Sequence, residues 1–201
     1  MIKRVVAGAS PANYEEFTYN SENQLIKYEV IVGTNLFVRA EYKYNGLGRR
    51  IEKNVDGVIT RYVYDNEDII LELNGSNNIQ ARYVHGPGID EPLMMTRGGN
   101  NYYYHADGLG SIVAITDETG AVIEKYVYDS FGNITIKDAS NNTLTQSAVG
   151  NSYTYTAREY DAESGLYYYR ARYYDFNTGR FIQEDPYAGN MDITQTERTL
   201  F

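Results

Sequence analysis

The sequence lacks cysteine and tryptophan and contains only four prolines and two histidines. The absence of cysteine excludes disulfide bonds, thiolate metal sites and a cysteine nucleophile. The two histidines, His85 and His105, lie far apart in sequence, so a zinc site on imidazoles is also disfavoured. We therefore expect no metal, no cofactor, and a fold held together by packing and hydrogen bonds.

The chain also lacks an excess of positive charge and any long apolar run. Its 27 acidic residues outnumber 18 basic residues, which gives a net charge of −9 at pH 7. Such a charge repels phosphate groups and anionic lipids, which argues against nucleic acid and membrane surfaces as partners. No segment has the apolar length needed to span a bilayer, and residues 1–9 form no clear signal peptide, so no membrane insertion is expected.

Tyrosine is abundant, with 22 residues, alongside 18 glycines. The tyrosines recur in a unit of about twenty residues, in which two aromatic residues flank a third residue and are followed by Asp or Asn and a turn containing Gly. Copies include Tyr42 and Tyr44; Tyr62, Tyr64 and Asp65; Tyr126, Tyr128 and Asp129; and Tyr173, Tyr174 and Asp175. Alternation with β-branched residues indicates strands, and the Gly-containing segments indicate hairpin turns. The sequence therefore predicts an all-β fold of repeated antiparallel β-hairpins that form a curved, open, Tyr-rich sheet.

The position of the aromatic residues predicts how the hairpins pack. Two aromatic residues that lie two positions apart point to the same face of a sheet. We expect neighbouring copies to stack their rings into a ladder of tyrosines. The acidic residue after each pair, such as Asp65 or Asp129, is expected to accept hydrogen bonds from the backbone of the following turn.

Two long stretches carry a resemblance to a known family. One runs from Tyr103 through His105-Ala106-Asp107-Gly108-Leu109-Gly110 to Gly132, and the other runs from Leu166 to Phe181 and ends at Asp185-Pro186. On these strings the chain resembles the RHS or YD-repeat proteins, and in particular their RHS repeat-associated core. The resemblance covers residues 16–189. We expect residues 1–15 to be a separate N-terminal segment and residues 190–201 to be a divergent tail.

The resemblance implies a spiral of β-hairpins that curls into a hollow shell. In toxins of this kind the shell encloses a C-terminal effector, in teneurins it lies at the cell surface, and similar chains are secreted or displayed. Eight hairpins make roughly 80 Å of sheet, whereas one turn around a lumen about 40 Å wide needs roughly 125 Å. We therefore expect one open arc and its C-terminal plug region, whose exposed edges need further N-terminal repeats, partner chains or self-association.

The resemblance also implies a candidate for catalysis, because the core of this family can act as an aspartyl autoprotease. The Asp-Pro motif makes Asp185 one candidate carboxylate, which Arg172 or Arg180 could orient. An aspartic mechanism needs two carboxylates that share a proton. The family's second Asp-Pro motif has no match after Asp185, so a second carboxylate would have to be borrowed, for example from Asp175 or Asp192. We therefore expect Asp185 to be a turn residue and the chain not to be an enzyme.

The expected function is that of a non-catalytic structural shell module, part of a cocoon that encapsulates a toxin or displays a surface scaffold. The alternative is a carbohydrate-binding or adhesion module, since aromatic rings stack on sugars and the family includes members described as glycan-binding. Exposed rings at Tyr167, Tyr168 and Tyr169 would favour this alternative. An autoprotease is the least favoured reading.

Overall fold

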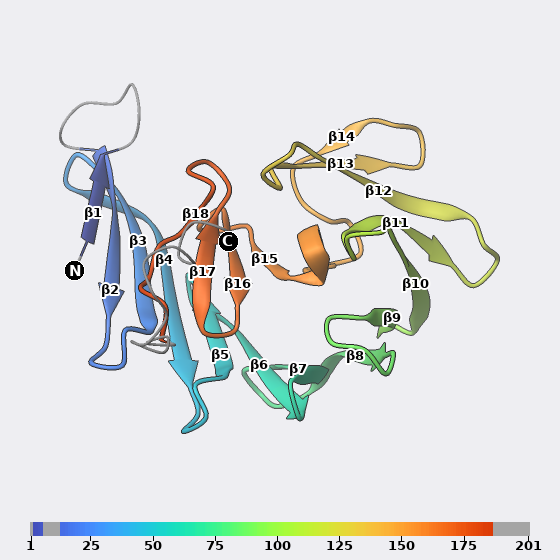
Figure 1. Cartoon of the computed structure of the whole chain (residues 1–201), viewed down its shortest axis with the longest axis horizontal. Coiled ribbons are helices and arrows are strands. Elements are labelled where there is room, and N and C mark those ends of the chain that lie inside the picture. Colours follow the sequence, from blue (N-terminus) through green and yellow to red (C-terminus); the bar gives the residue numbers. More distant parts are fainter. Residues whose placement is uncertain (1, 6–12, 187–201) are drawn as a thin grey trace, which may run out of the picture.

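The computed structural model describes residues 2–5 and 13–186. Fourteen strands form one antiparallel sheet in which each strand pairs with the next along the chain, and this sheet, which we call the wall, bends into an arc (Figure 1). The strands of the wall are β1 (Ile2–Val5), β2 (Asn13–Tyr19), β3 (Leu25–Val32), β4 (Asn35–Tyr44), β5 (Arg50–Val55), β6 (Val58–Asp65), β7 (Asp68–Asn74), β8 (Ile79–His85), β9 (Pro92–Arg97), β10 (Asn100–Ala106), β11 (Ile112–Asp117), β12 (Val122–Tyr128), β13 (Ile134–Asp138) and β14 (Thr143–Leu144).

A second antiparallel sheet of four strands lies inside the arc of the wall (Figure 1). Its strands are β15 (Glu159–Asp161), β16 (Leu166–Tyr169), β17 (Arg172–Asp175) and β18 (Arg180–Phe181). We call this sheet, residues 159–181, the plug. The connector from the wall to the plug contains a short 3-10 turn, Tyr155–Ala157. No helix in the part of the chain that the structure describes is long and apolar enough to cross a membrane.

Several turns of the wall are fixed by an acid or amide at the end of the preceding strand. Asn45 Oδ1 accepts hydrogen bonds from the backbone N–H groups of Leu47 and Arg49, both at 3.0 Å. Asp129 Oδ1 does the same with residues 131 and 133, at 2.8 and 3.0 Å. The same pair of bonds occurs at Asn20, Asn74, Asp107 and Asp117. Asp65 differs, because it lies opposite Asp68 across a turn of only two residues.

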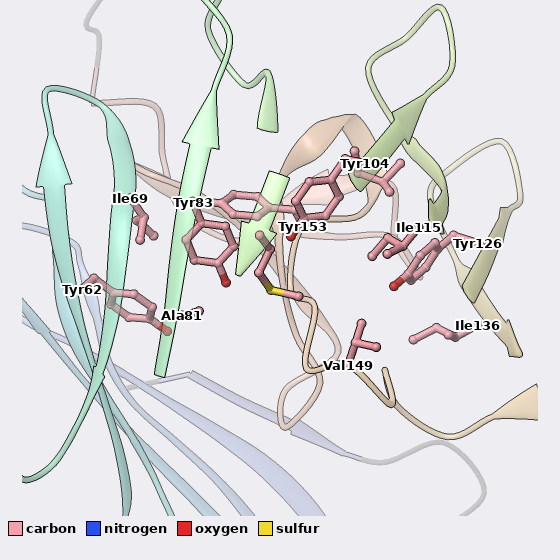
Figure 2. Close-up of a cluster of buried hydrophobic side chains, with 12 residues drawn as sticks. Tyr62, Ile69, Ala81, Tyr83, Tyr104, Ile115, Tyr126, Ile136, Val149 and Tyr153 are labelled. Atoms are coloured by element: carbon pink, nitrogen blue, oxygen red, sulfur yellow. The ribbon is translucent and has the colours of Figure 1, made fainter. Parts of the chain in front are cut away.

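The inner face of the wall carries the tyrosines, as the alternation predicts. Tyr62, Tyr83, Tyr104 and Tyr126 are buried there in one cluster with aliphatic residues (Figure 2). Tyr153 of the connector lies edge-on to two of these rings, with centroids 5.2 Å from Tyr83 and 6.3 Å from Tyr104. The connector therefore completes the core that the wall alone leaves open.

The ladder of stacked tyrosines that the repeats predict is not what the structure shows. Successive copies lie on alternate strands, which separates them by roughly 9.6 Å, more than the 7 Å at which rings still interact. The strand between Tyr83 and Tyr104 fills this space with Met95, and the strand between Tyr104 and Tyr126 fills it with Ile115. The rings of the wall instead contact rings of the connector and the plug, such as Tyr42 with Tyr173 at 5.8 Å.

The boundaries of the sheet also differ from those predicted. The wall begins before residue 16, because Ile2–Val5 pairs with residues 14–17 and β2 starts at residue 13. The predicted single sheet of residues 16–189 is divided into the wall and the plug, since the inward tyrosines of the wall need an apolar layer over them. The predicted tail, residues 190–201, lies outside the described residues.

Candidate functional site

The interface between the wall and the plug contains a buried cluster of charges centred on Arg50, which opens strand β5. Arg50 Nη2 donates a hydrogen bond to Glu159 at 2.9 Å, and Nη1 donates to Asp161 and, at 3.0 Å, to the Tyr173 hydroxyl. The backbone N–H of Arg50 donates to the Tyr168 hydroxyl at 2.9 Å. The side chain of Arg50 is fully buried. One wall residue thus holds three plug strands, β15, β16 and β17.

Aromatic rings enclose the guanidinium group of Arg50. Its central carbon lies 4.3 Å from the centroid of Tyr168, 5.4 Å from that of Tyr62 and 5.5 Å from that of Tyr42. A cation that is removed from water gains attraction from the negative faces of such rings. The tyrosines of the repeat therefore stabilise a buried charge as well as filling the core.

Lys53 extends the cluster along strand β5. Its Nζ lies 2.8 Å from Asp161 Oδ1 and 3.4 Å from Glu163 Oε2. The Tyr42 hydroxyl donates to the other oxygen of Glu163 at 3.2 Å. The cluster therefore brings two cations of the wall against three carboxyl groups of the plug, Glu159, Asp161 and Glu163.

The surroundings shift the pKa of each of these groups, and the direction of the shift differs between them. Burial opposes the charged forms of Arg50 and Lys53 and is the largest single effect on each, but the surrounding carboxyl and phenol groups, Asp161 first among them, together outweigh it and the pKa of each cation is raised. Burial likewise opposes ionisation of Asp161, but Arg50 and Lys53 outweigh it and the pKa of Asp161 is lowered. Burial raises the pKa of Glu159 and of Glu163. Lys53 and Asp161 thus form an ion pair, while Glu159 and Glu163 hold a proton more readily than an exposed glutamate does.

None of these five charged residues is predicted as functional from the sequence. The available signal is the alternation of Glu159, Asp161 and Glu163 along one strand and its turn, which places acidic groups at every second position. Their partners lie far earlier in the chain: Arg50 precedes Asp161 by 111 residues and Lys53 precedes it by 108 residues. Only the fold brings the two groups together.

The second tyrosine of each repeat pair finds a partner for its hydroxyl in the backbone of the wall. Tyr44 donates to the carbonyl oxygen of Leu25 at 2.7 Å, Tyr64 to that of Arg50 at 2.8 Å and Tyr128 to that of Ile112 at 2.6 Å. Tyr174 of the plug donates to the Phe131 carbonyl at 3.0 Å. These bonds link neighbouring hairpins and dock the plug on a wall turn.

The structure does not form an exposed aromatic stripe at Tyr167, Tyr168 and Tyr169. Tyr167 is 0% exposed and Tyr168 is 3% exposed. Tyr167 donates a hydrogen bond to the Gly132 carbonyl at 2.7 Å, and the Tyr169 hydroxyl lies against Thr156. Tyr167 and Tyr168 are buried because the plug uses them to contact the wall and the connector, whereas Tyr169 is partly exposed.

The candidate carboxylates Asp185 and Asp175 lie in separate ion pairs. Asp185 is half exposed and pairs with Arg172 at 3.0 Å, while Arg172 also stacks on Phe181 at 3.9 Å. Asp175 is buried and pairs with Arg4 of strand β1 at 2.6 Å. Arg180 lies opposite Asp175 in the register of β17 and β18. Asp192, the other candidate second carboxylate, lies outside the described residues.

The two histidines lie in different surroundings. His85 faces inward, with Nε2 at 2.9 Å from the Ile69 carbonyl oxygen, and His105 lies outside, with Nε2 at 3.0 Å from Thr116 Oγ1. Within residues 2–5 and 13–186, no group of three or more His, Asp or Glu side chains is arranged to hold a metal ion.

Comparison with known proteins places this architecture in a family. The model described as Teneurin YD-shell matches residues 8–200. The chain is 39% identical over 153 residues to the tRNA nuclease WapA of Bacillus subtilis (strain 168) and 37% identical over 153 residues to the tRNA3(Ser)-specific nuclease WapA of Bacillus spizizenii. Each match covers 75% of this chain and 6% of the relative, so the chain spans a small fraction of the length of these relatives.

Solved structures share the fold. A crystal structure of TcdB2-TccC3-TEV matches with a TM-score of 0.66 and 22% identity, over 89% of this chain and 9% of that one. A structure of the Photorhabdus luminescens Tc holotoxin pore matches with a TM-score of 0.57 and the same identity and coverage. With the repeated Tyr-Asp hairpins, the continuous wall and a family model that matches residues 8–200, the chain belongs to the Teneurin YD-shell family.

Proposed function

We propose that this chain is a non-catalytic wall segment of a YD shell together with the plug that covers its inner face. In a longer protein, the segment forms part of a shell that encapsulates a C-terminal toxin. The observation that carries the proposal is the continuous fourteen-strand wall, whose inner aromatic face is closed by the plug through Arg50 and Lys53.

The free edges of the wall support this function. Within residues 2–5 and 13–186, strands β1 and β14 end the fourteen-strand order and do not pair with each other. An unpaired strand edge presents rows of backbone donors and acceptors to another strand. Further RHS/YD repeats are the natural partners for these edges, because the matched relatives are much longer than this chain.

The names of the relatives point to an effector outside the matched part. Two are named as tRNA nucleases, and a third, from Burkholderia cenocepacia, is named as a double-stranded DNA deaminase toxin and matches at 24% identity over 204 residues. Both activities act on nucleic acid, whereas this chain has a net charge of −9. We infer that the chain supplies the shell and not the toxic activity, and that it works in a secreted or surface-displayed protein.

Light scattering combined with intact mass spectrometry tests this function. We expect intact chains that associate as concentration rises, because the edges of the wall are open. A chain that stays monomeric at every concentration would contradict the role as a shell segment. A loss of mass near Asp185 that disappears in Asp185→Asn, but not in the exposed-turn control Asp65→Asn, would contradict the absence of catalysis.

A further inference from the structure

The plug and its connector contact the wall at four places that are spread along the arc. Three of these contacts are ion pairs: Arg4 with Asp175 at 2.6 Å, Arg50 with Glu159 at 2.9 Å, and Asp90 with Arg158 and Arg170 at 2.6 and 2.8 Å. The fourth consists of the hydrogen bonds from Tyr167 and Tyr174 to the turn between β12 and β13, residues 129–133. One body inside the arc is therefore fastened to both arms of the wall (Figure 1).

The strand order of the wall leaves its curvature open. Among the described strands, each is hydrogen-bonded only to its neighbours in the chain, so no strand of one arm pairs with a strand of the other. Neighbouring strands in a sheet are rotated relative to each other by anything from roughly 10 to 35°. Added up over a fourteen-strand order, this range allows shapes from gently bent to tightly curled. Contacts across the arc must select one of them.

The turn of residues 129–133 fits closely against the connector and the plug. Gly132 has φ of +91°, and a Cβ added there would lie 2.6 Å from the ring of Tyr155 in the connector. The ring of Phe131 lies against Gly179 of the plug, where an added Cβ would meet it at 3.1 Å. Carbon atoms pack best at about 3.5 to 4.0 Å, so the approach at Gly132 requires a glycine. The turn is thus held from two sides.

We infer that the plug, together with its connector, sets the curvature of the wall, and that the turn of residues 129–133 is the contact that closes the arc. The ion pairs fasten the plug to the arm that contains β1, β5 and the turn between β8 and β9. The turn then fixes how far the arm of β10–β14 closes on the plug. Under the proposed function this distance determines the width of the lumen, but the inference itself depends only on the shape of this chain.

Two spin labels on the arms of the arc measure its curvature. Because the chain has no cysteine, Thr34→Cys and Ser140→Cys provide the only two thiols for labelling. Both residues lie in exposed turns, one between β3 and β4 and the other between β13 and β14, on opposite arms (Figure 1). Pulsed electron paramagnetic resonance gives the distribution of distances between the labels. We expect one narrow distribution, and a broad one would overturn the inference, because the plug would then not fix the wall.

Two glycine variants of the labelled protein separate the plug contact from backbone strain. Gly120 and Gly132 lie at the two ends of β12 in turns of the same kind, with φ of +83° and +91°, but a Cβ at Gly120 meets nothing within 4 Å. Both alanine variants carry similar strain. Only Gly132→Ala must move the turn away from Tyr155, by about 1 Å or more.

We expect the label distance in Gly132→Ala to lengthen and its distribution to broaden, while far-ultraviolet circular dichroism shows the same strand content. Gly120→Ala should keep the distribution of the parent protein. An equal shift in both variants would mean that strain alone deforms the wall, and no shift in Gly132→Ala would mean that the turn does not close the arc. Either result would overturn the inference.

The double variant Tyr167→Phe/Tyr174→Phe tests the same contact without adding atoms. It removes the two hydroxyl groups that donate to the turn, and it should broaden the distance distribution. The matched control is Tyr103→Phe, because the Tyr103 side chain is 38% exposed and alternates along β10 with the inward Tyr104. The control should keep the narrow distribution. A double variant that also keeps it would show that the wall holds its curvature by its own twist, which would contradict the inference.

Discussion

Arg50 of the wall and Asp161 of the plug form an ion pair in which the two side chains are 0% and 1% exposed. Two charges removed from water lose much solvation free energy, and only good geometry and further hydrogen bonds recover it. Here Glu159, Tyr173 and the ring of Tyr168 supply those contacts. The plug is therefore positioned by specific charges as well as by apolar packing.

Removal of the Arg50 side chain should strongly destabilise the protein. Arg50→Ala leaves Asp161 and Glu159 buried without their main cation, and breaking a buried pair in this way costs about 3 to 5 kcal/mol. The free energy of unfolding in urea measures the loss. The matched control is Arg39→Ala, because Arg39 pairs with Glu41 at 2.7 Å at the surface with 49% of its side chain exposed. Its effect should stay within about 0.5 kcal/mol, and equal losses in both variants would contradict the role of burial.

Two glycines have no atoms near the position that a Cβ would take. Substituting them by alanine therefore measures the effect of backbone strain apart from that of packing. Gly57 has φ of +90°, Gly46 has no positive φ, and an added Cβ meets nothing within 4 Å at either position. Gly57→Ala should lower the free energy of unfolding by about 1 to 2 kcal/mol, because an L-residue is strained at positive φ. Gly46→Ala should be neutral or stabilising by up to about 1 kcal/mol, because it only restricts the unfolded chain. Thermal unfolding of the pair gives the comparison, and a similar loss at both sites would rule out this explanation.

The raised pKa values of the buried tyrosines predict that the protein unfolds at alkaline pH. Burial raises the pKa of Tyr19 to about 12 and that of Tyr44 to about 12, and it raises the pKa of Tyr62 further. Unfolded tyrosine titrates near 10, so above that pH the unfolded chain holds fewer protons than the folded chain. The stability from these groups is therefore complete below about pH 10 and falls as pH rises toward 12.

The alkaline transition is measured by ultraviolet absorbance of tyrosinate together with circular dichroism. We expect the buried tyrosines to ionise in the same narrow pH range in which strand structure is lost. Gradual ionisation of all tyrosines near pH 10 with the strand signal intact would show that the rings are not buried as described.

Glu124 should be required to hold the connector against the wall. It is fully buried, and its carboxylate accepts hydrogen bonds from Ser147 Oγ at 2.9 Å and from the backbone N–H groups of Ala148 and Val149 at 2.5 and 3.2 Å. Glu124→Ala leaves these donors unsatisfied and should cost about 3 kcal/mol or more.

The comparison that isolates this effect is with Glu118→Ala, at an exposed turn of the same hairpin. Its effect on the free energy of unfolding in urea should be within about 0.5 kcal/mol. Glu124→Gln keeps one acceptor oxygen and should lie between the two. A Glu124→Ala protein as stable as wild type would mean that the connector is held by other contacts.

The local architecture could be predicted from the sequence because it depends on short-range rules. Alternation around Tyr62 and Tyr126 specifies strands and the inward face, and the acids and amides at Asn45 and Asp129 specify tight turns through bonds to residues two and four positions later. These interactions are complete within one hairpin, so they need no knowledge of the rest of the chain.

The relation between the wall and the plug depends on tertiary structure. Ring contacts were expected between successive repeats, but the spacing of alternate strands sends them to the connector and the plug, as Tyr153 shows against Tyr83 and Tyr104. The burial of Tyr167 and Tyr168 follows from the same docking and removes them as a binding surface.

By itself, the sequence determined an all-β chain of Tyr-rich hairpins with open edges, because strand periodicity and turn chemistry are encoded over a few residues. Tertiary structure decided that residues 159–181 fold back into the arc and that Arg50 and Lys53 meet Asp161 there. The physical reason is that a buried charge is tolerated only beside its counter-charge, and the two groups come from segments more than a hundred residues apart that only the completed fold brings into contact.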